Sequence, residues 1–237
     1  METRKTVGIL GGMGPMATVE FFRRLVAATP AETDQEHLHV LIDNDPRVPN
    51  RTDALLHRGP SPAPRLRAMA RRLEQAGADL LVMPCNTAHV YIEEIRASVS
   101  IPVLDMVRET VAAIEAASVG LLATDGTIRA RLYQEACAVR GVRVLVPEAA
   151  DQRSVMAAIE GIKRGGSPRR AEEELEPIAR RLERGGAKAV IAGCTEISLV
   201  PEDEMPLPWI DALDRLVEAT LRDAWTGVEF EDGKEAE

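Results

Sequence analysis

A segment of this chain occurs twice, and this internal repeat is the strongest constraint on how the chain can fold. The first copy, at 70–87, is ARRLEQAGADLLVMPCNT, and the second, at 179–195, is ARRLERGGAKAVIAGCT. The copies align without a gap up to their cysteines, so Cys85 pairs with Cys194. Each copy predicts an amphipathic helix, a glycine stop, an apolar strand and a cysteine at the carboxyl end of that strand.

Two further pairs of segments follow the same order in the two halves of the chain. VGIL at 7–10 is matched by VGLL at 119–122, and IPVLD at 101–105 is matched by LPWID at 207–211. Matched landmarks in one order indicate a duplicated βα unit that covers about half of the chain, rather than a solenoid of many short repeats.

Short apolar strands alternate with helices along the chain, which predicts parallel sheets with helices on both faces. We therefore expect an α/β protein of two pseudo-symmetric, doubly wound domains. The first comprises residues 1–105 with 209–237, because the last helix is expected to return to it, and the second comprises 106–208. Ligands bind beyond the carboxyl ends of the strands in such sheets. The active site is therefore expected in the cleft between the domains.

Apolar periodicity and turn residues place the individual elements. Segment 43–64 is rich in Pro, Asp and Asn and predicts a long loop that covers or binds something. Residues 227–237 are acidic and polar and predict a frayed tail. The expected strands are 6–12, 37–42, 80–84, 101–105, 119–122, 142–146, 189–192 and 207–211, and the expected helices are 16–28, 64–75, 90–98, 106–117, 152–164, 169–184 and 212–224.

Composition narrows the function classes. The net charge is −9 with acidic and basic residues interleaved, which disfavours nucleic-acid binding. No apolar run reaches membrane-spanning length, and the N-terminus lacks a signal-peptide core. We therefore expect a cytoplasmic protein without a membrane partner, whose three cysteines are reduced.

Three loops at strand ends are candidate ligand contacts. The turn GGMGP at 11–15 could offer backbone N–H groups to a carboxylate, or it could simply be a tight turn that needs small residues. The turn ATDGT at 123–127 occupies the matching place in the second half. Arg51, in the long loop, could bind a carboxylate through two N–H groups, or it could be a solvated surface arginine.

Four chemistries fit a symmetric pair of cysteines. A disulfide is disfavoured by a reducing compartment. A zinc site needs further ligands; His89 follows Cys85 by four residues, but Ser198 takes that place after Cys194. A cysteine nucleophile with a histidine base uses one thiol and leaves the duplication unexplained. Racemisation by two bases uses both, with one thiol on each face of a single carbon.

In the racemisation hypothesis one cysteine is a thiolate and the other a thiol, and the roles exchange with the direction of reaction. A following helix N-terminus favours the thiolate. Thr87, Thr195 and the Asn86 amide could hydrogen-bond a carboxylate as charge builds up on it, or they could be helix N-caps. The alternative for the cysteines is that they are small buried hydrophobic residues, as we expect for Cys137 in a helix.

These motifs resemble the aspartate/glutamate racemase superfamily, and most closely its cofactor-independent aspartate racemase branch, over the chain up to about Leu221. Glutamate racemases have Asp-Ser-Gly near the N-terminus and Gly-Cys-Thr-His, where this chain has Gly11-Gly12-Met13 and Glu196. The segments that carry the resemblance are GILGGMGP at 8–15, MPCNTAH at 83–89, LLATDGT at 121–127 and GCTEIS at 193–198.

The resemblance implies a two-domain homodimer that acts on a dicarboxylic amino acid without pyridoxal phosphate, another cofactor or a metal. It implies that Cys85 and Cys194 are the two bases. Arg51, in PNRT, resembles the arginine that holds the side-chain carboxylate, although Asn50 replaces the Asp usual beside it, and Lys163 resembles a second cation. Further expected substrate contacts are Met13, Asn86, Thr87, Thr124, Thr127 and Thr195, and Gly14 and Glu196 are expected to support them.

The sequence thus predicts an isomerase, an amino-acid racemase that interconverts L- and D-aspartate. One alternative is a broad-specificity racemase of the same family whose pocket accepts neutral side chains. The other is a non-catalytic amino-acid-binding protein on the same scaffold, which would bind its ligand without exchanging the Cα proton.

Overall fold

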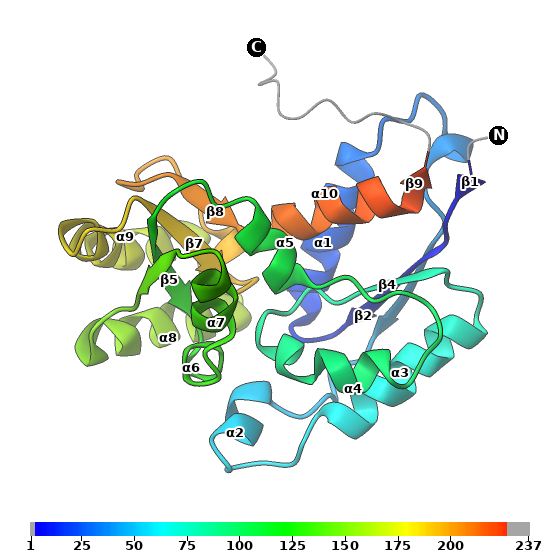
Figure 1. Cartoon of the computed structure of the whole chain (residues 1–237), viewed down its shortest axis with the longest axis horizontal. Coiled ribbons are helices and arrows are strands. Elements are labelled where there is room, and N and C mark those ends of the chain that lie inside the picture. The colour runs from blue at the N-terminus through cyan, green and yellow to red at the C-terminus, as the bar shows by residue number, and fades with distance from the viewer. Residues whose placement is uncertain (1–2, 227–237) are drawn as a thin grey trace.

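The protein contains two parallel sheets with helices on both faces, which confirms the expected α/β class (Figure 1). The structure is a computed structural model that describes residues 3–226, so the expected tail at 227–237 lies outside the described residues. The first sheet has the order β3-β2-β4, made of β2 (Val7–Gly11), β3 (Val40–Asn44) and β4 (Leu80–Val82). The second has the order β6-β5-β7-β8, made of β5 (Ser118–Ala123), β6 (Arg143–Leu145), β7 (Ala189–Gly193) and β8 (Trp209–Asp211).

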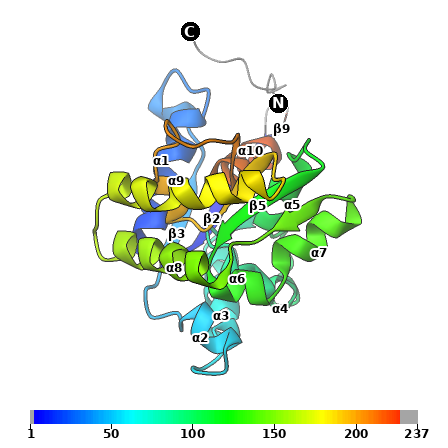
Figure 2. The ribbon, with the colours of Figure 1, turned by 90° about the vertical axis from the view of Figure 1, so that its left-hand side faces the viewer.

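One layer of helices covers each of the two faces of both sheets. On the first sheet α1 (Pro15–Ala28) and α10 (Ala212–Ala224) pack on one face, and α3 (Ala63–Gln75) and α4 (Ile92–Arg96) on the other. On the second sheet α8 (Ala149–Lys163) and α9 (Pro168–Arg184) lie side by side on one face (Figure 2), and α5 (Met106–Ala112) and α7 (Leu132–Val139) cover the other. The short elements are β1 (Thr3–Arg4), which pairs antiparallel with β9 (Trp225–Thr226), α2 (Arg51–Leu55), α6 (Asp125–Arg129), and the 3-10 turns η1 (Asp34–Glu36), η2 (Thr87–Tyr91) and η3 (Ile197–Leu199).

The central strands are buried on both faces because their alternate side chains enter two different cores. In β2, Val7 and Ile9 belong to the core beneath α1 and α10, whereas Leu10 belongs to the core beneath α3. In β7, Val190 packs under α8 and α9 while Ile191 packs toward α5 and α7. This two-sided burial explains why these strands are continuous apolar runs without polar alternation.

The sequence repeat is also a repeat of packing. Helix α3 places Leu73 on Gly8 of the central strand of its sheet, and α9 places the matching Leu182 on Gly120. A Cβ at Gly8 would lie 3.2 Å from the Leu73 Cβ, and a Cβ at Gly120 would lie 3.2 Å from the Leu182 Cβ. The missing side chain lets each helix approach its sheet closely, so the glycine and the leucine are paired requirements in both halves.

Both repeated helices end in the same way. Gly77 after α3 and Gly186 after α9 have φ values of 98° and 101°, which an L side chain rarely adopts. In each case the N–H three residues beyond the last helical residue bonds back to the carbonyl of the packing leucine, from Ala78 to Leu73 and from Ala187 to Leu182. This Schellman pattern satisfies the last carbonyls and turns the chain into the next strand.

Several expected elements differ from the structure. The helix expected at 106–117 ends at Ala112, and α6 and α7 were not expected. The expected strand at 101–105 is reduced to one bridge between Leu81 and Val103, because Pro102 has no N–H to donate and Asp105 already caps α5. The expected loop at 43–64 contains α2 in its middle.

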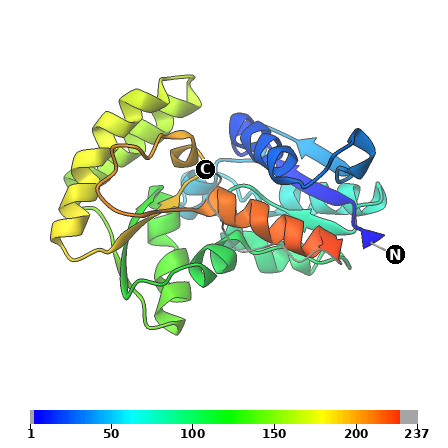
Figure 3. The ribbon, with the colours of Figure 1, turned by 90° about the horizontal axis from the view of Figure 1, so that it is seen from above.

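Helix α10 begins directly after β8 of the second sheet and lies along the first half beside α1 (Figure 3). Its apolar residues, including Leu213 and Leu216, share one core with Val7 and Ile9. Among residues 3–226, no helix is both long and apolar enough to cross a membrane.

Candidate active site

The two repeated cysteines open into one cavity between the two halves of the molecule. Cys85 follows β4 after Met83 and Pro84, and Cys194 follows β7 directly; each is 5% exposed. This central cavity is partly open to solvent and measures about 20 Å³, which is room for about one water molecule. Its lining residues are Met13, Asn50, Arg51, Thr52, Cys85, Asn86, Thr87, Thr124, Lys163, Cys194, Thr195 and Glu196.

Of the residues expected to contact a substrate, Thr127 lies behind the cavity wall. It is fully buried, and its hydroxyl lies 2.9 Å from that of Thr87 and 3.1 Å from that of Thr124. Thr87 and Thr124 are themselves 2.9 Å apart, so three hydroxyls form a triangle that joins the two halves. Thr124 also caps α6 by accepting the Thr127 N–H. The position of Thr127 therefore supports the two hydroxyls that do line the cavity.

Gly14 borders the same site through its lack of a side chain. A Cβ there would lie 3.1 Å from Glu196 Oε1, closer than nearly all such contacts. Gly14 thus makes room for the buried Glu196 carboxylate.

Glu196 holds Cys194 in its thiol form. The Cys194 S–H donates to Glu196 Oε2 across 3.0 Å, and both residues are buried. Burial raises the pKa of the Cys194 thiol well above its usual value of 9.0, and the charge of Glu196 raises it further, while Lys163 opposes both. Cys194 therefore carries its proton at neutral pH.

Lys163 supplies a cation at the end of α8. Its Nζ lies 4.0 Å from Glu196 Oε1. Burial alone would lower the pKa of Lys163, but the nearby Glu196, Cys194 and Cys85 raise it above its usual value. The side chain therefore remains a positively charged ammonium beside both thiols.

Arg51 is locked in place by backbone carbonyls. Its Nη1 donates to Val48 O at 3.3 Å and Pro49 O at 3.2 Å, and its Nη2 donates to Met13 O at 3.1 Å. Nε is buried and has no partner among the described residues. Nε–H and the second proton of Nη2 lie on the same edge of a guanidinium, so they can bind one carboxylate together.

Asn50 orients the helix that begins with Arg51. Its Oδ1 accepts the N–H groups of Thr52 at 2.9 Å and Asp53 at 3.2 Å, which caps α2. Asparagine and aspartate are equally good N-caps. Asn50 therefore caps α2 in the same way as the Asp of the resembled motif can.

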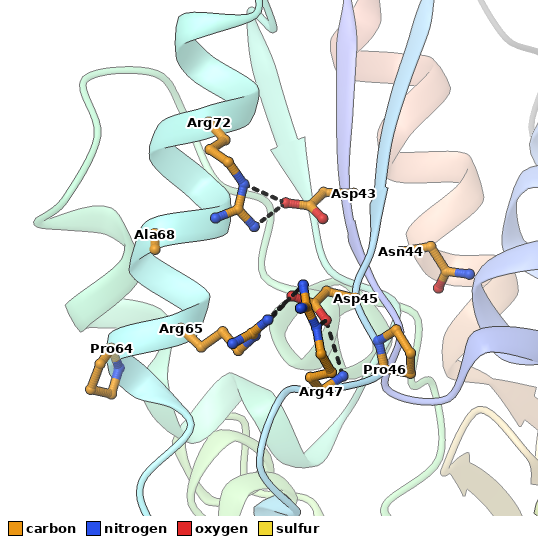
Figure 4. A pocket seen from close by; sticks show the side chains of 9 residues that line it. All are labelled: Asp43, Asn44, Asp45, Pro46, Arg47, Pro64, Arg65, Ala68 and Arg72. Atoms are coloured by element: carbon orange, nitrogen blue, oxygen red, sulfur yellow. Dashed lines mark hydrogen bonds and ion pairs between the residues drawn. The ribbon is translucent and has the colours of Figure 1, made fainter.

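The start of the loop that carries Arg51 is fastened to α3 by a buried carboxylate (Figure 4). Asp45 Oδ1 accepts from Arg47 Nε at 2.9 Å, and Asp45 Oδ2 accepts from Arg65 Nε at 2.8 Å. These bonds, led by that from Arg47, hold the pKa of Asp45 far below its usual value of 3.8. The Asp45 backbone also packs on Gly12, where a Cβ would approach to 2.3 Å. Asp45 thus fixes the loop against both β2 and α3.

His89 braces the Cys85 loop. Its Nε2 accepts the N–H of Met106 at 3.1 Å, so the proton is on Nδ1, which donates to Cys85 O at 2.9 Å. Burial lowers the pKa of His89, which keeps the ring neutral. Both ring nitrogens are therefore engaged. Within the described residues, no three His, Cys, Asp or Glu side chains group in a way that could hold a metal ion.

Tyr133 is a site residue that the sequence did not indicate. This side chain comes from α7 in the second half, is fully buried, and donates its hydroxyl to Asn86 Oδ1 in the first half. An aromatic residue on the inner face of a helix has the pattern of an ordinary core residue, so its sequence gives no indication of the contact.

The sequence pattern of the family described as Asp/Glu/Hydantoin racemase matches residues 10–220. The chain is 28% identical over 222 residues to the broad specificity amino-acid racemase RacX of Bacillus subtilis (strain 168), and the match covers 91% of this chain and 96% of that protein.

Two solved structures are similar over nearly the whole chain. The Picrophilus torridus aspartate racemase is 32% identical with a TM-score of 0.84, covering 93% of this chain and 94% of that one. The aspartate racemase homologue PH1733 of Pyrococcus horikoshii OT3 is 22% identical with a TM-score of 0.74, covering 93% and 99%, and supports the fold alone.

Proposed function

The chain belongs to the Asp/Glu/Hydantoin racemase family, and from this premise we propose that it interconverts L- and D-aspartate without a cofactor, using Cys85 and Cys194 as its two bases. One observation carries the proposal: two thiols from equivalent positions of a duplicated fold line one small cavity. Inversion of a stereocentre requires an acid and a base on opposite faces of one carbon, and a duplicated thiol supplies both.

In one direction the Cys85 thiolate removes the Cα proton, and the electron pair left on Cα is delocalised into the α-carboxylate. The Cys194 thiol then delivers its proton to the opposite face of Cα. Cys85 ends as a thiol and Cys194 as a thiolate, and the reverse reaction exchanges these roles. The raised pKa of Cys194 and its hydrogen bond to Glu196 suit it to be the proton donor at the start.

The intermediate carries extra negative charge on the α-carboxylate, and the cavity offers donors to that charge. Asn86 Nδ2 is buried and has no partner among the described residues, so it is available to a substrate oxygen. The Lys163 ammonium also faces the cavity. Fixed donors in a site that excludes water stabilise developing charge more strongly than water does.

The side-chain carboxylate is assigned to Arg51. Three carbonyls anchor its guanidinium, and the edge formed by Nε and Nη2 remains for one carboxylate. A preorganised arginine loses little conformational freedom when it binds such a group. Arg51 and Lys163 together give the cavity two cations, which favours a diacid over a neutral amino acid.

A cavity of about 20 Å³ holds no amino acid, so the site must widen to admit one. The triangle of Thr87, Thr124 and Thr127 and the contact between Tyr133 and Asn86 cross between the halves. These contacts must break or shift on opening and reform around the substrate. Closure then removes water from the thiols.

A second candidate is a racemase that accepts several amino acids, which the similarity to the broad specificity racemase of B. subtilis favours. Competition separates the two. If the enzyme is specific for aspartate, neutral amino acids at tenfold excess will leave racemisation of aspartate unchanged. Inhibition by those amino acids, together with their own racemisation, would support broad specificity.

The proposal is tested by incubating the enzyme, without pyridoxal phosphate, with L-aspartate in heavy water. We expect deuterium at Cα together with growing D-aspartate, and loss of racemisation in both Cys85→Ala and Cys194→Ala. Cys137→Ala is the matched control: this buried thiol, whose pKa burial raises to about 11, lies outside the central cavity. Ligand binding without exchange would indicate a non-catalytic binding protein. Loss of activity in one cavity variant alone would indicate single-thiol chemistry.

A further inference from the structure

Asn86 offers one half of its side-chain amide to the central cavity and the other half to Tyr133. The residue is 2% exposed; its Oδ1 accepts the Tyr133 hydroxyl, and its Nδ2 has no partner among the described residues. An asparagine amide can turn over and exchange its donor and acceptor ends. Whether the cavity has a donor or an acceptor at this point therefore depends on what fixes the amide.

Tyr133 is suited to hold the Asn86 amide in one orientation. The phenol is fully buried, and burial raises its pKa far above the usual 10.0, an effect that a hydrogen bond with Thr110 only partly offsets. The hydroxyl is therefore always protonated and needs an acceptor. The carbonyl oxygen of Asn86 accepts this proton, and the NH2 group must then point the other way, toward the cavity.

We propose that Tyr133 is a positioning residue that holds Asn86 with its NH2 group facing the substrate, so that the site presents a donor to a carboxylate. This inference rests on the proposed function, since it takes an amino-acid carboxylate as the group that Asn86 meets. Tyr133 acts through Asn86 and does not itself line the central cavity.

The position of Tyr133 adds a second consequence. Tyr133 belongs to the core of the second half, whereas Asn86 follows β4 in the first half. Their hydrogen bond exists only when the two halves are together. The Asn86 donor is therefore oriented in the closed arrangement and released from that orientation when the site opens.

The test is a double-mutant cycle on binding of succinate, a diacid that has no amine and no stereocentre. Tyr133→Phe removes one oxygen and should weaken succinate binding about tenfold, as expected for one hydrogen bond to a charged group. Asn86→Ala should weaken it to a similar extent. The double variant should bind no more weakly than Asn86→Ala, because Tyr133 has nothing left to orient. Losses that multiply in the double variant would overturn the proposal.

Two further variants keep the test decisive. Tyr91→Phe, which makes the same chemical change at the other tyrosine of the chain, should leave the Kd for succinate unchanged. Asn86→Asp keeps an acceptor for Tyr133 but places an oxygen where the donor was, so it should bind succinate at least as poorly as Asn86→Ala. If Tyr133→Phe does not fold, Asn86→Asp with wild-type affinity would by itself contradict the proposal.

Turnover gives an independent readout. Tyr133→Phe should raise the KM for aspartate and also lower kcat, because the donor binds the carboxylate in the ground state and more strongly as charge builds up on it. A variant in which both KM and kcat are unchanged would contradict a positioning role. If the wild type binds succinate but does not racemise aspartate, the proposed function fails while the binding cycle still tests Tyr133. A wild type that binds neither diacid contradicts both.

Discussion

The Cys194 thiol donates a hydrogen bond to Glu196 Oε2 across 3.0 Å inside the central cavity. This contact distinguishes the two repeated cysteines, because the second residue after Cys85 in the first copy is Thr87, not a carboxylate. The duplicated fold therefore places its two thiols in different electrostatic surroundings. Burial, reinforced by the charge of Glu196, keeps Cys194 in the thiol form.

Replacing Glu196 by glutamine should lower the pKa of Cys194. Burial remains, but the negative charge that also raises this pKa is removed, so thiolate formation should shift to lower pH. Thiolate absorbance followed against pH, with Cys194→Ser as the blank, measures this change. Glu172→Gln, which alters a buried carboxylate outside the cavity, should leave the Cys194 titration in place. An unchanged titration in Glu196→Gln would remove Glu196 from this role.

Replacing Asp45 by asparagine should loosen the loop that carries Arg51. The folded-state pKa of Asp45 is depressed, so its stabilising effect is fully present above its unfolded value of 3.8 and is lost as pH falls toward the folded value. The difference in melting temperature between wild type and Asp45→Asn should therefore be largest near neutral pH and smaller at pH 3. A difference that stays constant between these pH values would show that the ionised carboxylate is not the stabilising group.

Adding even a methyl group to the glycine beneath each repeated helix should destabilise the fold. Gly8→Ala would place its Cβ 2.6 Å from Leu81 Cδ2 and 2.9 Å from the Ala78 Cβ, and overpacking of this kind costs about 1–3 kcal/mol. Gly161→Ala, in α8, is the control, since no atom lies within 4 Å of its added Cβ. It should be neutral or stabilising by up to about 1 kcal/mol. Urea unfolding of both variants measures the difference, and equal midpoints would contradict the close packing of α3 on β2.

The alternation of strands and helices predicted the fold class, and the repeat predicted the meeting of Cys85 and Cys194. Parallel strands point their carboxyl ends toward ligands, and a duplicated unit has two such ends, so a cysteine at each end indicates a shared site. Lys163 came from the resemblance alone, whereas Arg51 and the turn that contains Thr124 were also indicated by their places in loops at strand ends. The structure brings all three to the same cavity.

The remaining features of the fold and of the site depend on contacts that local sequence patterns do not predict. Helix α2 is only five residues long and has no apolar period, although Asn50 followed by Asp53 is a recognisable start for a helix. The expected strand at 101–105 has strand-like composition, but its neighbours leave room for a single bridge at Val103. Tyr133 and Asn86 are far apart in sequence and meet only because the two halves close on each other.

The order in which deuterium appears at Cα tests the two-base account most directly. L-aspartate is mixed with the enzyme in heavy water, and the two enantiomers are separated during the first few per cent of the reaction. Mass spectrometry then measures the deuterium content of each enantiomer. Because one thiol keeps the proton that it removes while the other delivers a solvent deuteron, the first D-aspartate should carry deuterium while the remaining L-aspartate is still protiated. D-aspartate that retains the original proton, or deuterium that enters the L-aspartate pool equally fast, would contradict the account.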